Sequence, residues 1–132
     1  MPIRRAAIAD ADSIAIAHVM ARRETYAGIL SARYLAGQRV AEHAERWRGF
    51  LSSPDRREAH FVATDPAGNI VGFGACGPQR HPAAPFDGEI YGLYVLRRAQ
   101  HAGLGGGLMG AMARHLADGG ARSLVVEIAR DN

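Results

Sequence analysis

Five glycines lie between Gly103 and Gly110, at the start of a segment that otherwise has the pattern of a helix. Glycine costs about 1 kcal/mol relative to alanine inside a helix, so this many glycines need a separate explanation. The first N–H groups of a helix have no partner within it, and the helix dipole is positive at this end. Without side chains in the way, these donors can approach a phosphate closely. Close packing against a strand would explain one or two of the glycines, so the pattern favours an anion-binding helix N-terminus.

Two common phosphate-binding loops fit this stretch poorly. A Walker A loop needs a lysine, and every basic residue counted in the chain is an arginine. Gly105, Gly107 and Gly110 match the dinucleotide-binding fingerprint, and Glu127 follows at about the twenty-residue distance of that motif. However, residues 96–102 separate the preceding strand from the glycines, and little chain follows to complete a parallel sheet. A dinucleotide-binding domain is therefore only a remote alternative.

Few other side chains are placed for chemistry. Cys76 is the only cysteine, and because it lies in a strand pattern we expect a small buried hydrophobic residue and not a nucleophile. The six histidines are scattered, and none is three or four residues from another, the spacing that would put two on one helix face. We therefore expect surface or core histidines and no metal site.

Length and composition limit the protein class. With 132 residues, of which 48% are hydrophobic, we expect one globular domain over residues 1–132. No run reaches the roughly 18 apolar residues of a membrane span, and the first residues lack a signal-peptide core, which predicts a cytoplasmic bacterial-type protein without a membrane partner. The net charge is +3, but the arginine pairs have no interleaved aromatics, which disfavours a nucleic-acid partner.

Periodicity predicts the elements before the glycines. The segment PIRRAAI suggests a short strand. A helix follows over about residues 12–26, capped by Asp10 or Asp12, with Ile14, Ala17 and Ala21 on one face. A second helix begins after Ser31; its helical spacing is carried by Val40, Ala44, Trp47 and Leu51, with Trp47 as a core anchor. Two strands joined by the turn DPAG give an antiparallel hairpin over 60–76.

The remaining elements surround the glycines. The segment GPQRHPAAPFDG reads as a loop, and residues 89–96 as a strand in which Gly92 marks a bulge or a close approach. The glycines then open a helix to about Asp118, with a core stripe of Leu104, Leu108, Met112 and Leu116. A final buried strand, RSLVVEI, completes the order β-α-α-β-β-β-α-β.

The stretch GEIYGLYVLRRAQHAGLGGGLMGAM resembles motif A of the GNAT superfamily of acyl-CoA-dependent N-acyltransferases. Gln100, Gly103 and Gly105 match its Gln/Arg-x-x-Gly-x-Gly/Ala pattern after a strand and a short connector. The upstream order also fits, and ETYAGILSARYL resembles the family's segment between its first two helices. The resemblance implies an α/β (α+β) fold with a mixed, mostly antiparallel central sheet flanked by helices. It also implies acetyl transfer from acetyl-CoA to a primary amine of a small molecule or peptide.

The resemblance also implies a coenzyme site. In the family, backbone N–H groups of the glycine loop hold the coenzyme A pyrophosphate, and the free backbone of the preceding strand pairs with the pantetheine arm. Carried over by position, the pyrophosphate loop comprises Gln100, His101, Ala102, Gly103, Leu104, Gly105 and Gly106. The pantetheine strand comprises Leu93, Tyr94 and Val95.

Glu89 stands where many family members carry the base that deprotonates the amine. A carboxylate beside a partly buried cleft can have its pKa raised toward neutrality; the alternative is a solvated glutamate at the strand edge. Tyr91, two residues after Glu89, would point to the same face of the strand. It would contact the acceptor or simply pack. Tyr26, Tyr34 and the loop 78–87 are further acceptor-side candidates, with core packing as the alternative for the two tyrosines.

The chain ends at VVEIARDN, whereas family members usually continue into a helix that carries a tyrosine and then two more strands. We therefore expect a fold truncated after the fifth strand. Its last strand would have an open edge, which predicts a homodimer through this edge. The missing segment also favours the alternative of a non-catalytic acyl-CoA-binding or structural domain.

Overall fold

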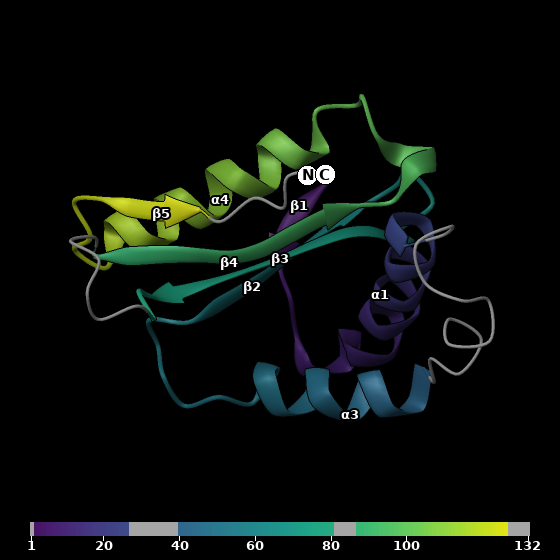
Figure 1. Ribbon diagram of the computed structural model, residues 1–132, viewed down its shortest axis with the longest axis horizontal. Coiled ribbons are helices and arrows are strands. Elements are labelled where there is room, and N and C mark those ends of the chain that lie inside the picture. Colours follow the sequence, from purple (N-terminus) through teal and green to yellow (C-terminus); the bar gives the residue numbers. More distant parts are fainter. Residues whose placement is uncertain (1, 27–39, 81–86, 127–132) are drawn as a thin grey trace.

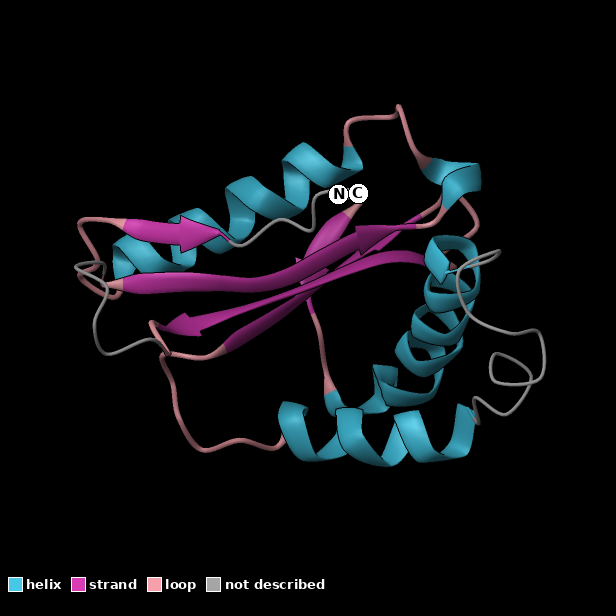
Figure 2. Cartoon of the chain, viewed as in Figure 1, coloured by secondary structure: helices cyan, strands magenta, loops and turns pink. Residues whose placement is uncertain are grey.

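The computed structural model describes residues 2–26, 40–80 and 87–126, with the side chains of residues 25 and 26 excepted. Its elements are β1 (Ile3–Arg5), a 3-10 turn (Ile8–Asp10), α1 (Ala11–Tyr26), α3 (Val40–Leu51), β2 (Ala59–Thr64), β3 (Ile70–Pro78), β4 (Gly88–Val95), a 3-10 turn (Arg97–Ala99), α4 (Leu104–Asp118) and β5 (Leu124–Val126). This confirms the predicted order of strands and helices (Figure 2). The start of the second helix after Ser31 lies outside the described residues.

The strands form one sheet in the order β1-β2-β3-β4-β5. Strands β1 to β4 pair with one another in antiparallel fashion, and β5 is parallel to β4. Helix α4 covers one face, and α1 and α3 lie on the other (Figure 1). This is the predicted mixed, mostly antiparallel sheet, and it excludes the parallel sheet of a dinucleotide-binding domain.

The predicted hairpin turn joins β2 to β3. The Gly68 N–H donates to the Asp65 carbonyl oxygen at 2.9 Å. Gly68 has φ 89°, in the left-handed region that favours glycine. The Asp65 carboxylate also accepts from the N–H groups of Ala67 and Asn69, at 3.0 and 2.9 Å. These bonds fix the register in which β3 reaches the site.

The helices bury most of the positions that their periodicity predicts, but Val40 at the start of α3 is 37% exposed and Leu51 at its end is half-buried. On one side of the sheet, Leu108, Met112 and Leu116 of α4 pack with Ile90 and Cys76, while Leu104 is half-buried. On the other side the buried residues are Ile14, Ala17 and Ala21 of α1 and Ala44 and Trp47 of α3. Cys76 is fully buried, as predicted, and this burial raises the pKa of its thiol to about 11.

The prediction of a buried last strand is wrong for the part that is described. Leu124 is 36% exposed, and Val125 and Val126 are half-buried. The reason is that, among the strands that the structure describes, β5 has a neighbour only in β4. Pairing with a second copy through this edge stays a prediction. None of the described helices has the length and apolar character needed to cross a membrane.

Candidate functional site

Strand β4 contains a bulge in the middle of the sheet. Ala75 of β3 lies opposite Gly92, but the next residue, Cys76, lies opposite Ile90, so Tyr91 is the extra residue on β4. This irregularity lies beside Gly92, where the sequence predicts it. In the described part of the chain β5 pairs with β4 only over Gly88, Glu89 and Ile90. On the side of β4 that faces away from β3, residues 91–95 therefore present a backbone edge that no described strand covers.

The connector after β4 leads directly to the start of α4. The Gln100 side chain donates from Nε2 to the Val95 carbonyl oxygen at 2.8 Å, which ties the connector to the end of the strand. His101 has φ 69° and Gly103 has φ 78°, so the chain turns through two left-handed residues before the helix. The first helical bond runs from the Gly107 N–H to the Gly103 carbonyl at 3.0 Å. The N–H groups of residues 104–106 thus belong to the open first turn.

Glycine occurs at the five positions for different structural reasons. Gly103 is the N-cap in a left-handed conformation, and at Gly107 a Cβ atom would lie 2.9 Å from Ile3 Cγ1. At Gly105 the nearest atom to a Cβ would be Val95 Cγ2 at 4.0 Å, and at Gly106 no atom lies within 4 Å. Gly110 is equally open. Packing therefore explains one of the five, and the first-turn glycines favour the anion-binding interpretation.

Two other predicted loop residues border a cavity. Ala102 and Leu104 line a pocket of about 590 Å³ beside the start of α4. Arg98 lines the same pocket and is paired with Asp65, at 3.4 Å between Nη1 and Oδ2. The predicted pyrophosphate loop thus lies at an accessible surface with a guanidinium close by.

A second pocket, of about 370 Å³, opens on the face of the sheet that carries α1 and α3. It is lined by His18, Ala21, Arg22, Trp47, Phe73, Ala75, Tyr91, Gly92, Leu93 and Tyr94. We call it the bulge pocket, because its lining includes Tyr91, the extra residue of the β4 bulge, and the adjacent Gly92. Tyr91, Leu93 and Tyr94 were predicted from the sequence as site residues, and the pocket brings them together. Val95 is not among the lining residues.

His18 is a pocket residue that the sequence analysis did not select. Trp47 Nε1–H donates to His18 Nδ1 at 3.1 Å, and the rings of His18 and His43 lie 4.8 Å apart. Burial, with the nearby charges of His43, Arg22 and Arg46, lowers the pKa of His18 to about 4. Near neutral pH the ring is therefore uncharged, with its proton on Nε2 because Nδ1 accepts. Its only sequence signal is its place one helical turn after Ile14.

Glu89 is buried beside this pocket but does not line it. The residue is 1% exposed, because its strand is paired at this position with Gly77 on one side and Val125 on the other. Its carboxylate accepts from the Arg80 backbone N–H at 2.9 Å and from Arg80 Nη2 at 3.0 Å. The alternative of a solvated glutamate is therefore wrong.

Arg80 also connects Glu89 with the bulge. Its guanidinium carbon lies 3.9 Å from the centroid of the Tyr91 ring, and the Tyr91 hydroxyl donates to the Pro78 carbonyl at 2.6 Å. Tyr94 is held from the other side, because its hydroxyl donates to Glu24 Oε2 at 3.0 Å. The Arg97 N–H donates to the same oxygen at 3.1 Å. Tyr26 ends α1, but its side chain, Tyr34 and residues 81–86 lie outside the described part.

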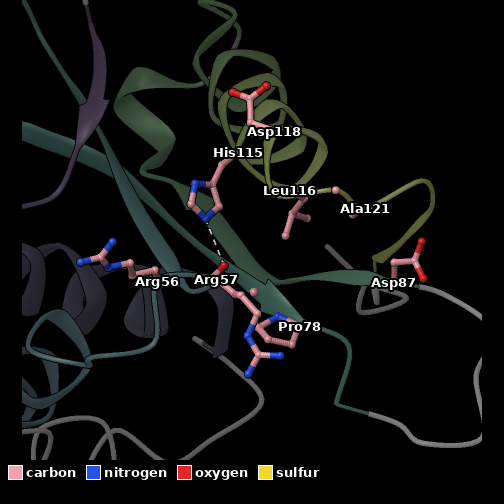
Figure 3. A pocket seen from close by; sticks show the side chains of 11 residues that line it. Arg56, Arg57, Pro78, Asp87, His115, Leu116, Asp118 and Ala121 are labelled. Carbon is pink, nitrogen blue, oxygen red and sulfur yellow. Dashed lines mark hydrogen bonds between the residues drawn. The ribbon is translucent and has the colours of Figure 1, made fainter.

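A separate pocket of about 600 Å³ lies at the opposite end of α4. Figure 3 shows Arg56, Arg57, Asp87, His115 and Asp118 around it, with His115 Nε2 3.0 Å from the Arg57 carbonyl oxygen. Along α4, His115 lies nine residues, or about 14 Å, after Gly106, the last residue of the predicted pyrophosphate loop, so this pocket is not part of the predicted coenzyme site. Among the residues that the structure describes, no three His, Cys, Asp or Glu side chains are grouped to hold a metal ion.

Comparison with known families gives one match over most of the chain. The model of the acetyltransferase (GNAT) family matches residues 21–132. The uncharacterized N-acetyltransferase YuaI of Bacillus subtilis (strain 168) is 32% identical over 130 residues, which make up 98% of this chain and 72% of that protein.

Solved acetyltransferases have the same fold. PaiA N-acetyltransferase from Thermoplasma acidophilum, in complex with coenzyme A, superposes with a TM-score of 0.78 and 19% identity over 98% of this chain and 80% of that one. Ribosomal-protein-alanine N-acetyltransferase from Brucella melitensis biovar Abortus 2308 superposes with a TM-score of 0.68 and 18% identity over 97% of this chain and 79% of that one. AAC(6')-Iy, solved with a bisubstrate analog, superposes with a TM-score of 0.68 and 16% identity over 98% of this chain and 80% of that one. At these identities the similarity establishes the fold.

Proposed function

This chain belongs to the GNAT family of N-acetyltransferases, and from that premise we propose how it binds its two substrates. Acetyl-CoA lies along the open edge of β4 with its pyrophosphate at the start of α4, and the amine enters the bulge pocket. Residues 1–132 act together as one acetyltransferase domain. The observation that carries this assignment is that Gly92, Leu93 and Tyr94 belong both to the open edge and to the pocket.

The pyrophosphate site uses the backbone of the predicted loop. The N–H groups of residues 104–106 lie in the first turn of α4, where the helix dipole favours an anion. Gly105 and Gly106 leave that approach open, and Gln100 holds the connector to the end of β4. Arg98 lies beside the loop in the same pocket as Asp65, with which it is paired. PaiA, which has the same fold, was solved with coenzyme A, and this supports coenzyme binding by a protein of this fold.

The pantetheine arm takes the place of a neighbouring strand. Beyond the bulge, the backbone of Leu93, Tyr94 and Val95 can exchange hydrogen bonds with an extended amide chain, as a sheet edge does with a peptide. The arm then runs from the start of α4 toward Tyr91. This direction brings the thioester to the mouth of the bulge pocket.

Transfer proceeds by direct attack of the amine on the thioester. The amine nitrogen forms a bond to the carbonyl carbon, the carbon–sulfur bond breaks, and the electron pair leaves on the coenzyme thiolate. A backbone N–H of β4 stabilises the charge that develops on the carbonyl oxygen. The amine must lose a proton, and this proton goes to a base directly or through water.

Glu89 is the base that we propose. It lies two residues before Tyr91, the bulge residue that lines the pocket, and its carboxylate is held by Arg80. The Arg80 side chain is 56% exposed, so it can move away and let water connect Glu89 with the pocket. His18 is a poor base, because its pKa is lowered to about 4, chiefly by burial.

A turnover assay tests the proposal. The chain is incubated with acetyl-CoA and a panel of amines, and acetylated product is detected by mass spectrometry. We expect acetylation of at least one amine and none without acetyl-CoA. Coenzyme binding without any acetylated amine would overturn the proposal and indicate the alternative, an acyl-CoA-binding domain.

A further inference from the structure

The charges around the bulge pocket indicate its acceptor. We propose that the pocket takes a small amine that carries its own carboxylate beside an apolar group, as an apolar α-amino acid does. This inference rests on the proposed function and deepens it, because it names the substrate class of the same pocket.

The pocket wall contains a positive charge and no carboxylate among its described lining residues. Arg22 of α1 is the charged side chain that lines it, and His18 beside it is uncharged near neutral pH because burial lowers its pKa to about 4. The charges of Arg22 and Arg46 both contribute to lowering the pKa of His18 and of His43. The positive charge of Arg22 therefore lies beside His18, on the α1 side of the pocket.

Glu24, Glu58 and Glu89 lie near lining residues, and none of the three lines the pocket. Glu24 accepts from the Tyr94 hydroxyl and the Arg97 N–H. Glu89 accepts two hydrogen bonds from Arg80 and does not line the pocket. A site for a polycationic amine needs carboxylates to pair with its charges. Arg22 at this pocket would instead repel such an amine.

The other walls are apolar and aromatic. Trp47, Phe73 and Tyr91 line the pocket, and Trp47 is held in place by its bond to His18. A volume of about 370 Å³ suits a small molecule with an apolar side chain. An apolar side chain can bury its surface against these walls, and a flexible polyamine would bury less apolar surface there.

The positions of Arg22 and the bulge set the orientation of the acceptor. Arg22 belongs to the α1 wall, whereas Tyr91, Gly92 and Leu93 belong to the β4 wall. A carboxylate paired with Arg22 anchors the ligand on the helix side and leaves its amine free to face β4. The proposed thioester position lies on that side.

Three acceptors separate the possibilities: L-phenylalanine, phenethylamine, which lacks only the carboxylate, and spermidine, a polycation. We expect kcat/KM to be at least ten times higher for phenylalanine than for phenethylamine, and lowest for spermidine. In Arg22→Met the preference for phenylalanine should disappear, and Arg22→Lys should restore part of it. Arg23→Met changes an exposed residue of the same helix and should leave the preference intact.

Product binding provides a measurement that does not depend on turnover. N-acetyl-L-phenylalanine should bind more tightly than N-acetylphenethylamine to the parent chain and to Arg23→Met, but not to Arg22→Met, in calorimetry with coenzyme A present. Circular dichroism establishes that each variant is folded. Equal or higher kcat/KM for phenethylamine or spermidine, or an unchanged preference in folded Arg22→Met, would overturn the inference. Failure of turnover with selective product binding would instead contradict only the proposed function.

Discussion

Arg80 covers the carboxylate of Glu89, with its backbone N–H 2.9 Å from one oxygen and its Nη2 3.0 Å from the other. The glutamate side chain is 2% exposed, whereas the arginine side chain is 56% exposed. The pair therefore joins a buried acid to a cation at the surface, and the same guanidinium lies over the Tyr91 ring. Access to the proposed base depends on this arginine.

Replacing Glu89 with glutamine tests its role as base. The amide keeps an oxygen that can accept from Arg80 but cannot take a proton from the amine. We expect Glu89→Gln to lower kcat by about 10²–10⁴-fold, the usual contribution of a positioned base, without changing coenzyme A affinity. Steady-state kinetics and calorimetry check this together. Unchanged kcat in a folded variant would mean that another group accepts the proton.

Removing the Arg80 side chain tests the ion pair. Arg80→Met leaves the backbone hydrogen bond but takes one partner from a buried oxygen, which we expect to lower the unfolding free energy by about 1–2 kcal/mol in urea titrations. In the Glu89→Gln background the same substitution should cost less, because no buried charge is left behind. Equal costs in the two backgrounds would show that the pair contributes no coupling.

The buried imidazole of His18 predicts how stability depends on pH. Burial lowers the pKa of His18 from an ordinary 6.5 to about 4, so between these values the unfolded chain binds more protons than the folded one. The resulting stability is complete above pH 6.5 and is lost as the pH falls toward 4. With allowance for solvent screening, we expect a loss of about 1–2 kcal/mol.

His18→Asn provides the comparison. Its side-chain oxygen can accept from Trp47 Nε1, but it does not take up a proton in this range. Urea titrations at several pH values should give a shallower slope than in the parent. Some slope should remain, because burial also lowers the pKa of His43 and of His60. Parallel pH profiles for the two proteins would contradict this account of His18.

The thiol of Cys76 should be unreactive in the folded protein. Burial raises its pKa from 9.0 to about 11, which lowers the thiolate fraction at pH 8 by about a hundredfold. A thiol-specific chromogenic reagent should therefore modify the native chain at least that much more slowly than the chain in concentrated urea. Rapid modification of native protein would show that β3 opens readily or that the thiol is accessible.

The fold could be predicted where the signal is local. The spacing of Leu108, Met112 and Leu116 specifies the buried face of α4, and the DPAG turn specifies the hairpin. The reason for each glycine is not local. The sequence indicates that close packing explains few of the glycines, but only the proximity of Gly107 to Ile3 in the fold identifies Gly107 as the one that packing explains.

The candidate site depends on contacts between distant segments, which periodicity does not report. Trp47 meets His18 across 29 residues of sequence, so the bulge pocket could not be assembled from either helix alone. The burial of Glu89 depends on strands on both sides and on Arg80. The apolar run around Leu124 predicts burial, but its exposure depends on the neighbours of β5 in the sheet, which the run alone does not report.

The most direct test of the account is coenzyme A binding measured by calorimetry in two glycine variants of α4. Gly105→Val puts a side chain on the first turn, where we propose that the pyrophosphate approaches, whereas Gly110→Val makes the same change at an open position farther along the helix. Both should fold, because neither position is closely packed. We expect Gly105→Val to weaken binding at least tenfold and Gly110→Val to leave it unchanged. Unchanged affinity in folded Gly105→Val would contradict the assignment of this helix start as the coenzyme site.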